Sequence, residues 1–229
     1  MTGGNTSGQT SRVTVLDYGI GNLLNVVRAL EHCGATVRVA SQASDVAVMG
    51  DMPDRMVLPG VGSFGDAMEE LRQRGFDDLV KRHVATERPF LGICVGAQLL
   101  FDVGEEHSSN GVHAGLGLIP GRVQPVPAST PAGQSLRIPH IGWSALQLPP
   151  ARVGWQGTPL SGVALGEPAY FVHSFAPVPT HEKHRLADTS YHGVRICAAV
   201  VRDHIYGCQF HPERSAAVGL RILQQFLCL

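Results

Sequence analysis

A cysteine set between glycines is the first feature of this sequence that could do chemistry. Residues 92–96, GICVG, follow an apolar run and precede Ala97-Gln98-Leu99-Leu100, which has the composition of a helix. A sharp turn from strand to helix, eased by small neighbours, has the form of a nucleophile elbow and presents Cys94 at the carboxyl edge of a sheet. The following helix N-terminus favours the thiolate, and the Val95 amide would face an oxyanion formed on an attacked carbonyl.

A buried core cysteine is the alternative interpretation, because cysteine in an apolar run more often packs than reacts. The flanking glycines favour catalysis, since packing alone does not need them at these positions. We expect a catalytic Cys94 to be exposed at its turn, so Cys94→Ala should remove activity with little loss of stability.

A thiol nucleophile needs a base, and the base needs a group that orients it. Among 11 histidines, His211 stands out in YGCQFHPERS, residues 206–215, between an apolar strand and Pro212. In an extended segment, residues i and i+2 point the same way, so Glu213 can hold the imidazole with its other nitrogen toward a partner. The pattern predicts a Cys-His-Glu triad.

The segment LPGVGSFGDAM, residues 58–68, supplies a third piece of such a site. Gly60 and Gly62 flank Val61 directly after a predicted strand, and the amides of this tight loop can point into a cleft. If that strand neighbours the strand that ends at Cys94, the loop is a second donor to an oxyanion. A turn capped by Asp66 is the alternative role, and the two roles are compatible.

Strands and helices that could position these residues alternate over the first half of the chain. Apolar runs predict strands at 13–17, 55–60 and 89–94, and alternation predicts one at 36–40. Amphipathic spacing predicts helices at 22–34, 66–74, 76–86 and from 95 onward. Beyond residue 112 we expect strands within 121–126, 137–143, 169–177, 195–203 and 204–210, the last two turning at Asp203-His204, and a closing helix at 215–229. Alternation of this kind favours a parallel sheet covered on both faces.

The sequence therefore predicts one α/β domain at 13–229, with three layers around a mixed, mostly parallel central sheet. The polar residues 1–12 read as a disordered tail without the apolar core of a secretory signal.

Composition narrows the class of protein further. With 229 residues, 44% hydrophobic, the chain can bury one sizeable core, and a net charge of −1 gives no reason to expect nucleic acid or an anionic membrane as partner. No apolar run reaches the ~18 residues of a spanning helix. The five cysteines are scattered without CxxC spacing, which indicates reduced thiols in the cytoplasm rather than disulfides or a zinc site.

These motifs occur together in a known family. GICVGAQ with a distant HPE resembles the class I, triad-type glutamine amidotransferases. The segments VLDYGIGNLLNVVRAL, LPGVGSFGDAM, GICVGAQLLF, IPHIGW, YFVHSF and FHPERS, in this order, are similar to the glutaminase subunits of imidazole glycerol phosphate synthase. The resemblance covers residues 13–229.

The resemblance implies a role for each matched residue. Cys94 would attack the side-chain amide of glutamine, which releases ammonia and leaves a thioester; His211 would act as acid and then base, oriented by Glu213. The amides of Val95 and of Gly60, Val61 and Gly62 would form the oxyanion site. The glutamine pocket would include Gln98, His173, Ser174 and Phe175, and the subunit interface Asn22, Asn25, Tyr170 and Arg214. No metal or organic cofactor is implied.

Ammonia released into bulk water would become protonated and escape, so the family implies an adjoining acceptor. That acceptor is a (β/α)8-barrel cyclase, which makes imidazole glycerol phosphate and aminoimidazole carboxamide ribotide in histidine biosynthesis. The present chain is too short to include the barrel, so we expect a heterodimer with a separate cyclase subunit.

Departures from the family pattern leave alternatives open. Val95 and Ala97 stand where leucine and methionine are expected, and Arg214 stands where lysine is usual, which alters reach and hydrogen-bond geometry at the interface. The same glutaminase chemistry could serve another acceptor synthase, for example in surface-sugar biosynthesis. A non-catalytic α/β regulatory subunit with a structural cysteine is the other alternative.

Overall fold

A seven-stranded sheet organises the molecule, with its strands in the order β11-β12-β13-β4-β3-β1-β2. The computed structural model describes residues 11–19, 22–48, 52–106 and 112–229. The strands are β1 (Arg12–Leu16), β2 (Thr36–Ala40), β3 (Arg55–Gly60), β4 (Phe90–Cys94), β11 (Arg185–Tyr191), β12 (Val194–Arg202) and β13 (Ile205–Cys208). Neighbours from β2 through β13 run parallel, whereas β12 and β11 are antiparallel additions. The prediction of a mixed, mostly parallel sheet is confirmed.

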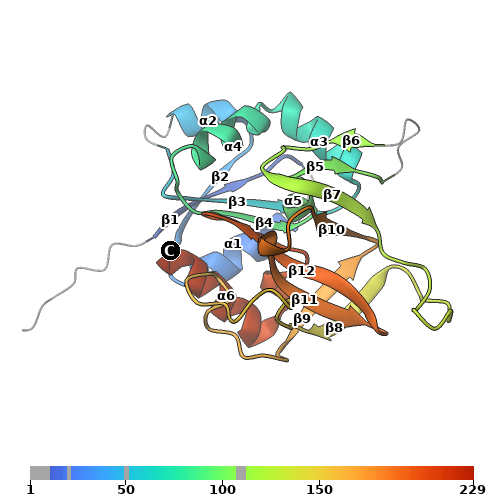
Figure 1. Ribbon diagram of the computed structural model, residues 1–229. Helices are drawn as coiled ribbons and strands as arrows, with labels where there is room; N and C mark the ends of the chain where they lie inside the picture. The colour runs from blue at the N-terminus through green and yellow to red at the C-terminus, as the bar shows by residue number, and fades with distance from the viewer. Residues whose placement is uncertain (1–10, 20–21, 49–51, 107–111) are drawn as a thin grey trace, which may run out of the picture.

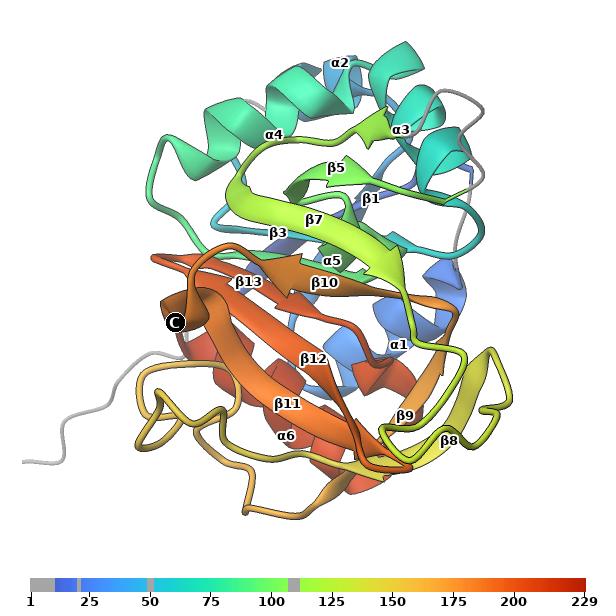
Figure 2. The same cartoon turned by 45° about the vertical axis from the view of Figure 1, so that its right-hand side comes forward.

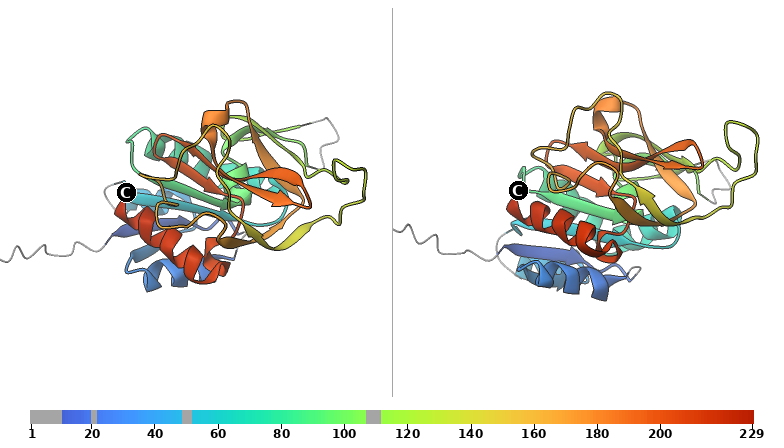
Figure 3. Two further views of the ribbon diagram at one scale, coloured as in Figure 1. Left: turned by 60° about the horizontal axis from the view of Figure 1, so that its bottom comes forward. Right: turned by 90° about the horizontal axis from the view of Figure 1, so that it is seen from below.

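Helices cover both faces of this sheet (Figures 1 and 3). On one face lie α1 (Leu23–His32) and α6 (Ala216–Cys228); on the other lie α2 (Ala43–Val48), α3 (Phe64–Gln73) and α4 (Phe76–Val84). The connection from β1 to β2 runs in one direction along the sheet, and the connection from β2 to β3 runs back in the other. Because crossovers between parallel strands are right-handed, the helices in these two connections lie on opposite faces. The apolar runs that predicted strands are buried between these layers, as at Val15, Leu58 and Leu91, each 0% exposed.

Segments between residues 101 and 179 form two smaller sheets beside the central one (Figure 2). One has the order β10-β7-β5-β6, with β5 (Phe101–Gly104), β6 (His113–Ala114), β7 (Ile119–Pro125) and β10 (Phe175–Pro179). The other is an antiparallel ribbon of β8 (His140–Ala145) and β9 (Pro168–His173). The remaining short elements are α5 (Val95–Gln98) and the 3-10 turns η1 (Glu182–His184) and η2 (Pro212–Arg214).

The structure differs from the sequence-based expectation at several elements. The single strand expected within 169–177 is two strands, because the chain leaves the β8-β9 ribbon at Ser174 and enters another sheet. The elements α2, β5 and β11 were not predicted. Of the expected tail 1–12, residues 1–10 lie outside the described part of the chain, and Arg12 already belongs to β1.

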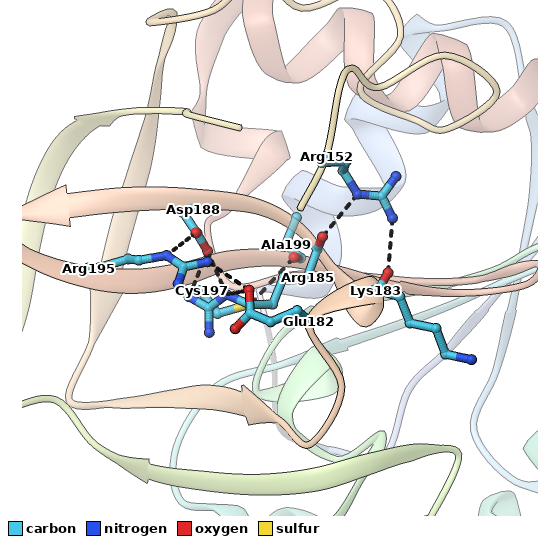
Figure 4. A network of polar contacts seen from close by, with 8 residues as sticks. All are labelled: Arg152, Glu182, Lys183, Arg185, Asp188, Arg195, Cys197 and Ala199. Atoms are coloured by element: carbon cyan, nitrogen blue, oxygen red, sulfur yellow. Dashed lines mark hydrogen bonds and ion pairs between the residues drawn. The ribbon is translucent and has the colours of Figure 1, made fainter. Parts of the chain in front are cut away.

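A network of ion pairs around a buried carboxylate links β11 and β12 at the antiparallel edge of the sheet (Figure 4). The carboxylate of Asp188, 2% exposed, accepts hydrogen bonds from Nε and Nη2 of Arg185 at 2.9 and 2.6 Å and from Nε of Arg195. The backbone of Asp188 also exchanges two hydrogen bonds with Gln147. One residue therefore ties β11, β12 and the segment after β8 together.

Candidate active site

Adjacent strands bring the three predicted pieces of the site to one edge of the sheet. β4 pairs with β3 on one side, where Gly60 is opposite Cys94, and with β13 on the other, where Cys208 is opposite Ile93. All three strands are parallel, so the loop after Gly60, the turn at Cys94 and the segment leading to His211 leave the sheet together. The strand that ends at Gly60 therefore neighbours the strand that ends at Cys94, which is the condition for the 60–62 loop to act as a second oxyanion donor.

Cys94 lies in a strained turn and lines a cavity of about 320 Å³. Its φ and ψ of 55° and −112° belong to a region that side-chain-bearing residues rarely adopt. The residue is 4% exposed, so the expectation of an exposed thiol is wrong: the sulfur reaches the cavity, not the outer surface. The helix that follows has four residues, so its dipole is weaker than the sequence argument assumed.

Close backbone packing explains the glycines around Cys94. A Cβ on Gly96 would stand 1.9 Å from the carbonyl oxygen of Leu58, and one on Gly92 would stand 2.5 Å from the oxygen of Gly96. Packing alone therefore does require them, contrary to the sequence-based argument. Gly60 is constrained in the same way by the hydroxyl of Tyr18, at 2.3 Å from a Cβ built there. These contacts press β3, β4 and α5 together and hold the turn.

His211 and Glu213 form a buried pair beside this turn. Nδ1 of His211 donates to Oε1 of Glu213 at 2.8 Å, and the side chains are 4% and 1% exposed. The 3-10 turn η2, not the extended segment expected from the sequence, brings the carboxylate to the ring. With Nδ1 occupied, Nε2 is buried without a hydrogen-bond partner among the described residues and is the nitrogen left for chemistry.

The electrostatics of His211 depend on its two neighbours. Burial lowers the pKa of His211, but its interactions with Cys94 and with Glu213 outweigh burial and raise that pKa to about 10. A protonated imidazole in this position stabilises a thiolate on Cys94 and carries the proton that a leaving amine needs.

Most residues predicted for the substrate pocket line the cavity. The lining comprises Val61, Gly62, Cys94, Val95, Gln98, Glu106, Pro139, Val172, His173, Ser174, Phe175 and His211. Gly60 and Glu213 are predicted residues outside this lining: Gly60 packs under Tyr18, and Glu213 stands behind His211.

His173 reaches the cavity as part of a hydrogen-bonded pair of histidines. Its Nδ1 donates to the carbonyl oxygen of Phe175 at 2.9 Å, so its Nε2 accepts from Nδ1 of His140 at 3.0 Å, and Nε2 of His140 accepts from Ser144 at 2.9 Å. Burial lowers the pKa of His173 to about 3 and that of His140 to about 4. His173 therefore fixes the 173–175 segment as a neutral ring whose two nitrogens are both in use.

Two residues near the nucleophile were missed by the sequence argument. The carboxylate of Glu106 lines the cavity and accepts from the backbone amide of Phe64 at 2.8 Å, at the start of α3. Gln209 is 1% exposed and directs its amide nitrogen at the sulfur of Cys94, 3.8 Å away. The sequence around neither residue marks it as functional. Gln209 lies two residues before His211, and only the parallel pairing of β13 with β4 could have placed it near Cys94.

The residues predicted for a subunit interface lie near the same edge. Asn25 donates to the side chain of Asn22 at 2.9 Å at the start of α1, and the guanidinium of Arg214 lies 4.6 Å from the ring centre of Tyr170. α1 packs against η2, which joins the two pairs. Trp143, 53% exposed, lies against Tyr170 with ring centres 5.8 Å apart.

The described residues contain neither a metal-binding cluster nor a membrane-spanning helix. No group of three or more His, Cys, Asp or Glu residues there is arranged to hold a metal ion. No helix there is long and apolar enough to cross a membrane.

A cysteine, a histidine and a carboxylate meet at the carboxyl edge of an α/β sheet, which is the arrangement that a thiol hydrolase needs. The model of the family "Glutamine amidotransferase class-I" matches residues 14–228, and the chain belongs to that family. The fold agrees: the solved PurLQS from Thermotoga maritima superposes with a TM-score of 0.67 at 18% identity, covering 96% of this chain and 98% of the other.

Within the class, the chain is similar to one kind of subunit. It is 45% identical to imidazole glycerol phosphate synthase subunit HisH 1 of Legionella pneumophila (strain Lens), over 95% of this chain and 99% of the relative. It is 40% identical to the chloroplastic imidazole glycerol phosphate synthase hisHF of Arabidopsis thaliana, over 97% of this chain but 35% of that longer protein. The chain is a HisH-type glutamine amidotransferase.

Proposed function

We propose that this chain hydrolyses L-glutamine to glutamate and ammonia at Cys94 and passes the ammonia to a separate cyclase subunit of imidazole glycerol phosphate synthase. The observation that carries the proposal is the convergence of Cys94, His211 and the loop at Val61 on one cavity. Its volume of about 320 Å³ is at the small end for ligand pockets and suits a single amino acid.

In the first step, the Cys94 thiolate attacks the carboxamide carbon of glutamine. The carbonyl oxygen gains the negative charge, and backbone amides of Val95 and the 60–62 loop stabilise it. Nε2 of protonated His211 gives its proton to the departing nitrogen, so ammonia leaves and a γ-glutamyl thioester remains. Glu213 keeps Nδ1 occupied at 2.8 Å, which holds Nε2 toward the reacting atoms.

In the second step, water replaces ammonia. His211, now neutral, accepts a proton from the water as its oxygen attacks the thioester carbon. The second tetrahedral intermediate uses the same amide donors, and its collapse breaks the carbon–sulfur bond. Glutamate leaves, and Cys94 and His211 return to the thiolate and imidazolium.

Two polar side chains account for selection of glutamine. The Glu106 carboxylate can pair with the α-ammonium group of the substrate. Gln98 has its amide nitrogen committed to the oxygens of Phe175 and Gln209, at 2.9 and 3.0 Å, so only its oxygen can accept from the substrate. A substrate with a carbon backbone of glutamine length places its carboxamide between Cys94 and His211.

A partner surface continues from the cavity onto the β8-β9 ribbon. Ile141 and Trp143 lie on its outward face at 57% and 53% exposure, and Val172, paired with Ile141, lines the cavity. Arg214 and Tyr170 border the same face. An exposed apolar and aromatic patch next to a product exit is suited to a protein partner.

We assign this surface to a (β/α)8-barrel cyclase that forms a heterodimer with the chain and converts the ammonia into imidazole glycerol phosphate and aminoimidazole carboxamide ribotide. The longer hisHF relative supports the pairing, since most of its length has no counterpart here. Such a complex works in the cytoplasm, in accord with five free cysteines.

A reconstituted complex tests the proposal. With the cyclase subunit of the same organism and its nucleotide substrate, glutamine should support product formation, and Cys94→Ala should abolish it. The same variant should still form product with ammonium as the nitrogen source, because the cyclase site is intact. Continued glutamine-dependent turnover by Cys94→Ala would reject the mechanism; glutamine hydrolysis without coupling to this cyclase would indicate another acceptor synthase.

A further inference from the structure

A buried carboxamide contacts the sulfur of the nucleophile. Nε2 of Gln209 lies 3.8 Å from Sγ of Cys94, and its Oε1 accepts from Nε2 of Gln98 at 3.0 Å. Gln209 and Gln98 are 1% and 3% exposed, so both amides exchange hydrogen bonds inside the protein. The triad mechanism makes no use of Gln209.

A backbone carbonyl fixes which end of each amide faces which neighbour. The oxygen of Phe175 can only accept, so the Gln98 atom 2.9 Å from it must be the nitrogen. That same nitrogen lies 3.0 Å from Gln209, whose facing atom must therefore be the oxygen. The other end of the Gln209 amide, the one at the sulfur, is then an N–H donor.

A hydrogen-bond donor held at a sulfur favours the thiolate over the thiol. Other sources of that preference are few here: α5 has four residues, and His211 is the one cationic partner proposed for the sulfur. The N–H of Gln209, one residue past β13, also restricts where the sulfur can sit, as does the carbonyl oxygen of Val172, which lies 4.0 Å from the sulfur.

We propose that Gln209 is a catalytic residue whose amide N–H stabilises and aims the Cys94 thiolate, and that Gln98 is a positioning residue that holds this amide in its donor orientation. The inference extends the proposed nucleophilic role of Cys94 and rests on it. A purely structural Gln209 would fill the same space without affecting the protonation of the sulfur.

Alkylation of Cys94 without substrate separates these roles. Gln209→Glu keeps the size but replaces the N–H with a carboxylate oxygen, and Gln209→Met keeps the length but removes the donor. Each purified variant is treated with iodoacetamide from about pH 5 to about pH 10, and the Cys94 peptide is quantified by mass spectrometry. Cys228, an exposed thiol at the far end of α6, is the internal reference in every sample.

Both variants should raise the pH midpoint of Cys94 alkylation by about one unit, because the donor to the thiolate is lost. The shift should be larger for Gln209→Glu than for Gln209→Met. The Cys228 midpoint should stay in place. Gln42→Glu, on an exposed residue before α2, adds the same charge and should leave the Cys94 midpoint unchanged. At neutral pH, kcat for glutamine hydrolysis should fall about tenfold with KM altered less than about threefold.

A double variant tests the positioning role of Gln98. If Gln98 acts through Gln209, then Gln98→Met should also raise the midpoint, and adding it to Gln209→Met should give no further rise. Additive shifts would overturn the role of Gln98. An unchanged midpoint in folded Gln209→Met and Gln209→Glu would overturn the role of Gln209, whereas a wild-type Cys94 that resists alkylation at every pH would overturn the proposed nucleophile itself.

Discussion

At the scale of single residues, the backbone of Cys94 carries the conformational cost of the site. Its φ of 55° lies in a region where a Cβ is disfavoured by about 1 kcal/mol or more. The strain persists because the glycines around it let β3, β4 and α5 pack at backbone contact. The side chain of Cys94 is thus held in position by its neighbours in the absence of any ligand.

Replacing Cys94 tests this strain through the order of two variants. Cys94→Gly should be more stable than Cys94→Ala by about 1 kcal/mol in free energy of unfolding, because glycine relaxes at positive φ. Both should lack glutamine hydrolysis. Urea unfolding measures the free energies of unfolding of the two variants. The matched control is the same pair of substitutions at Cys197, 2% exposed in β12, where the alanine variant should be the more stable. An alanine variant at least as stable as glycine at Cys94 would contradict strain at that position.

Buried neutral histidines give the molecule a second testable property. Burial lowers the pKa of His83 to about 4, and its ring nitrogen lies 3.1 Å from the carbonyl oxygen of Pro89, just before β4. A depressed pKa means that the unfolded chain binds the proton more readily, so stability is present above about pH 6.5 and is lost as the pH falls toward 4. His173 and His140 act with the same sign.

His83→Gln should therefore reduce the acid sensitivity of folding. The wild type should lose free energy of unfolding between pH 7 and pH 5, and the variant should lose about 2 kcal/mol less, since glutamine can donate to Pro89 without titrating. His211, whose pKa is raised to about 10, acts mainly above this interval and with the opposite sign. Exposed His32 is the control: His32→Gln should keep the wild-type slope, and equal slopes in His83→Gln would reject the assignment.

At the scale of elements, the strands of the central sheet were predicted from the sequence except β11, whereas the order in which they pair was not. The segments 36–40 and 55–60 are strands with the predicted bounds: the first alternates in polarity, and the second is an apolar run that ends at Pro59-Gly60. β11 has no such pattern, because its residues RLADTSY include a buried charge, Asp188, which pairs with Arg185 and Arg195. Nor does spacing along the chain reveal that β13 lies beside β4, so Gln209 could not be found from the sequence.

The ion-pair network at Asp188 makes a prediction at this scale. Asp188→Ala should cost about 3–5 kcal/mol of free energy of unfolding, because it leaves Arg185, itself 8% exposed, as a buried charge without its carboxylate. Glu182→Ala, in the same network but at a side chain 55% exposed, should cost less than about 1 kcal/mol. Denaturant unfolding compares the two, and a similar small cost for both would mean that the buried pair does not hold β11.

At the scale of the whole molecule, the proposed active site and the proposed partner surface share one edge of the sheet. Parallel strands bring Cys94, the segment leading to His211 and the 60–62 loop there, and the β8-β9 ribbon adds an outward apolar face that meets the cavity at Val172. A product that must avoid bulk water would gain from this arrangement, because a partner that binds over Trp143 as proposed would also cover the exit. The family motifs predicted the triad, whereas the exposed ribbon face emerged only from the pairing of β8 with β9.

Trp143→Glu should separate the two functions of this edge. A charge in place of a central aromatic contact should weaken binding of the cyclase subunit by about thirtyfold or more, as measured by titration calorimetry. Glutamine-dependent product formation should fall at a cyclase concentration that saturates the wild type, while ammonium-dependent turnover by the cyclase persists. Val48→Glu is the matched control, because Val48 is 88% exposed at the end of α2, next to the amino end of β3 and away from the site edge. Equal affinity for wild type and Trp143→Glu would place the partner elsewhere, since an interface that buried the ribbon face could not accept an unpaired carboxylate at that position.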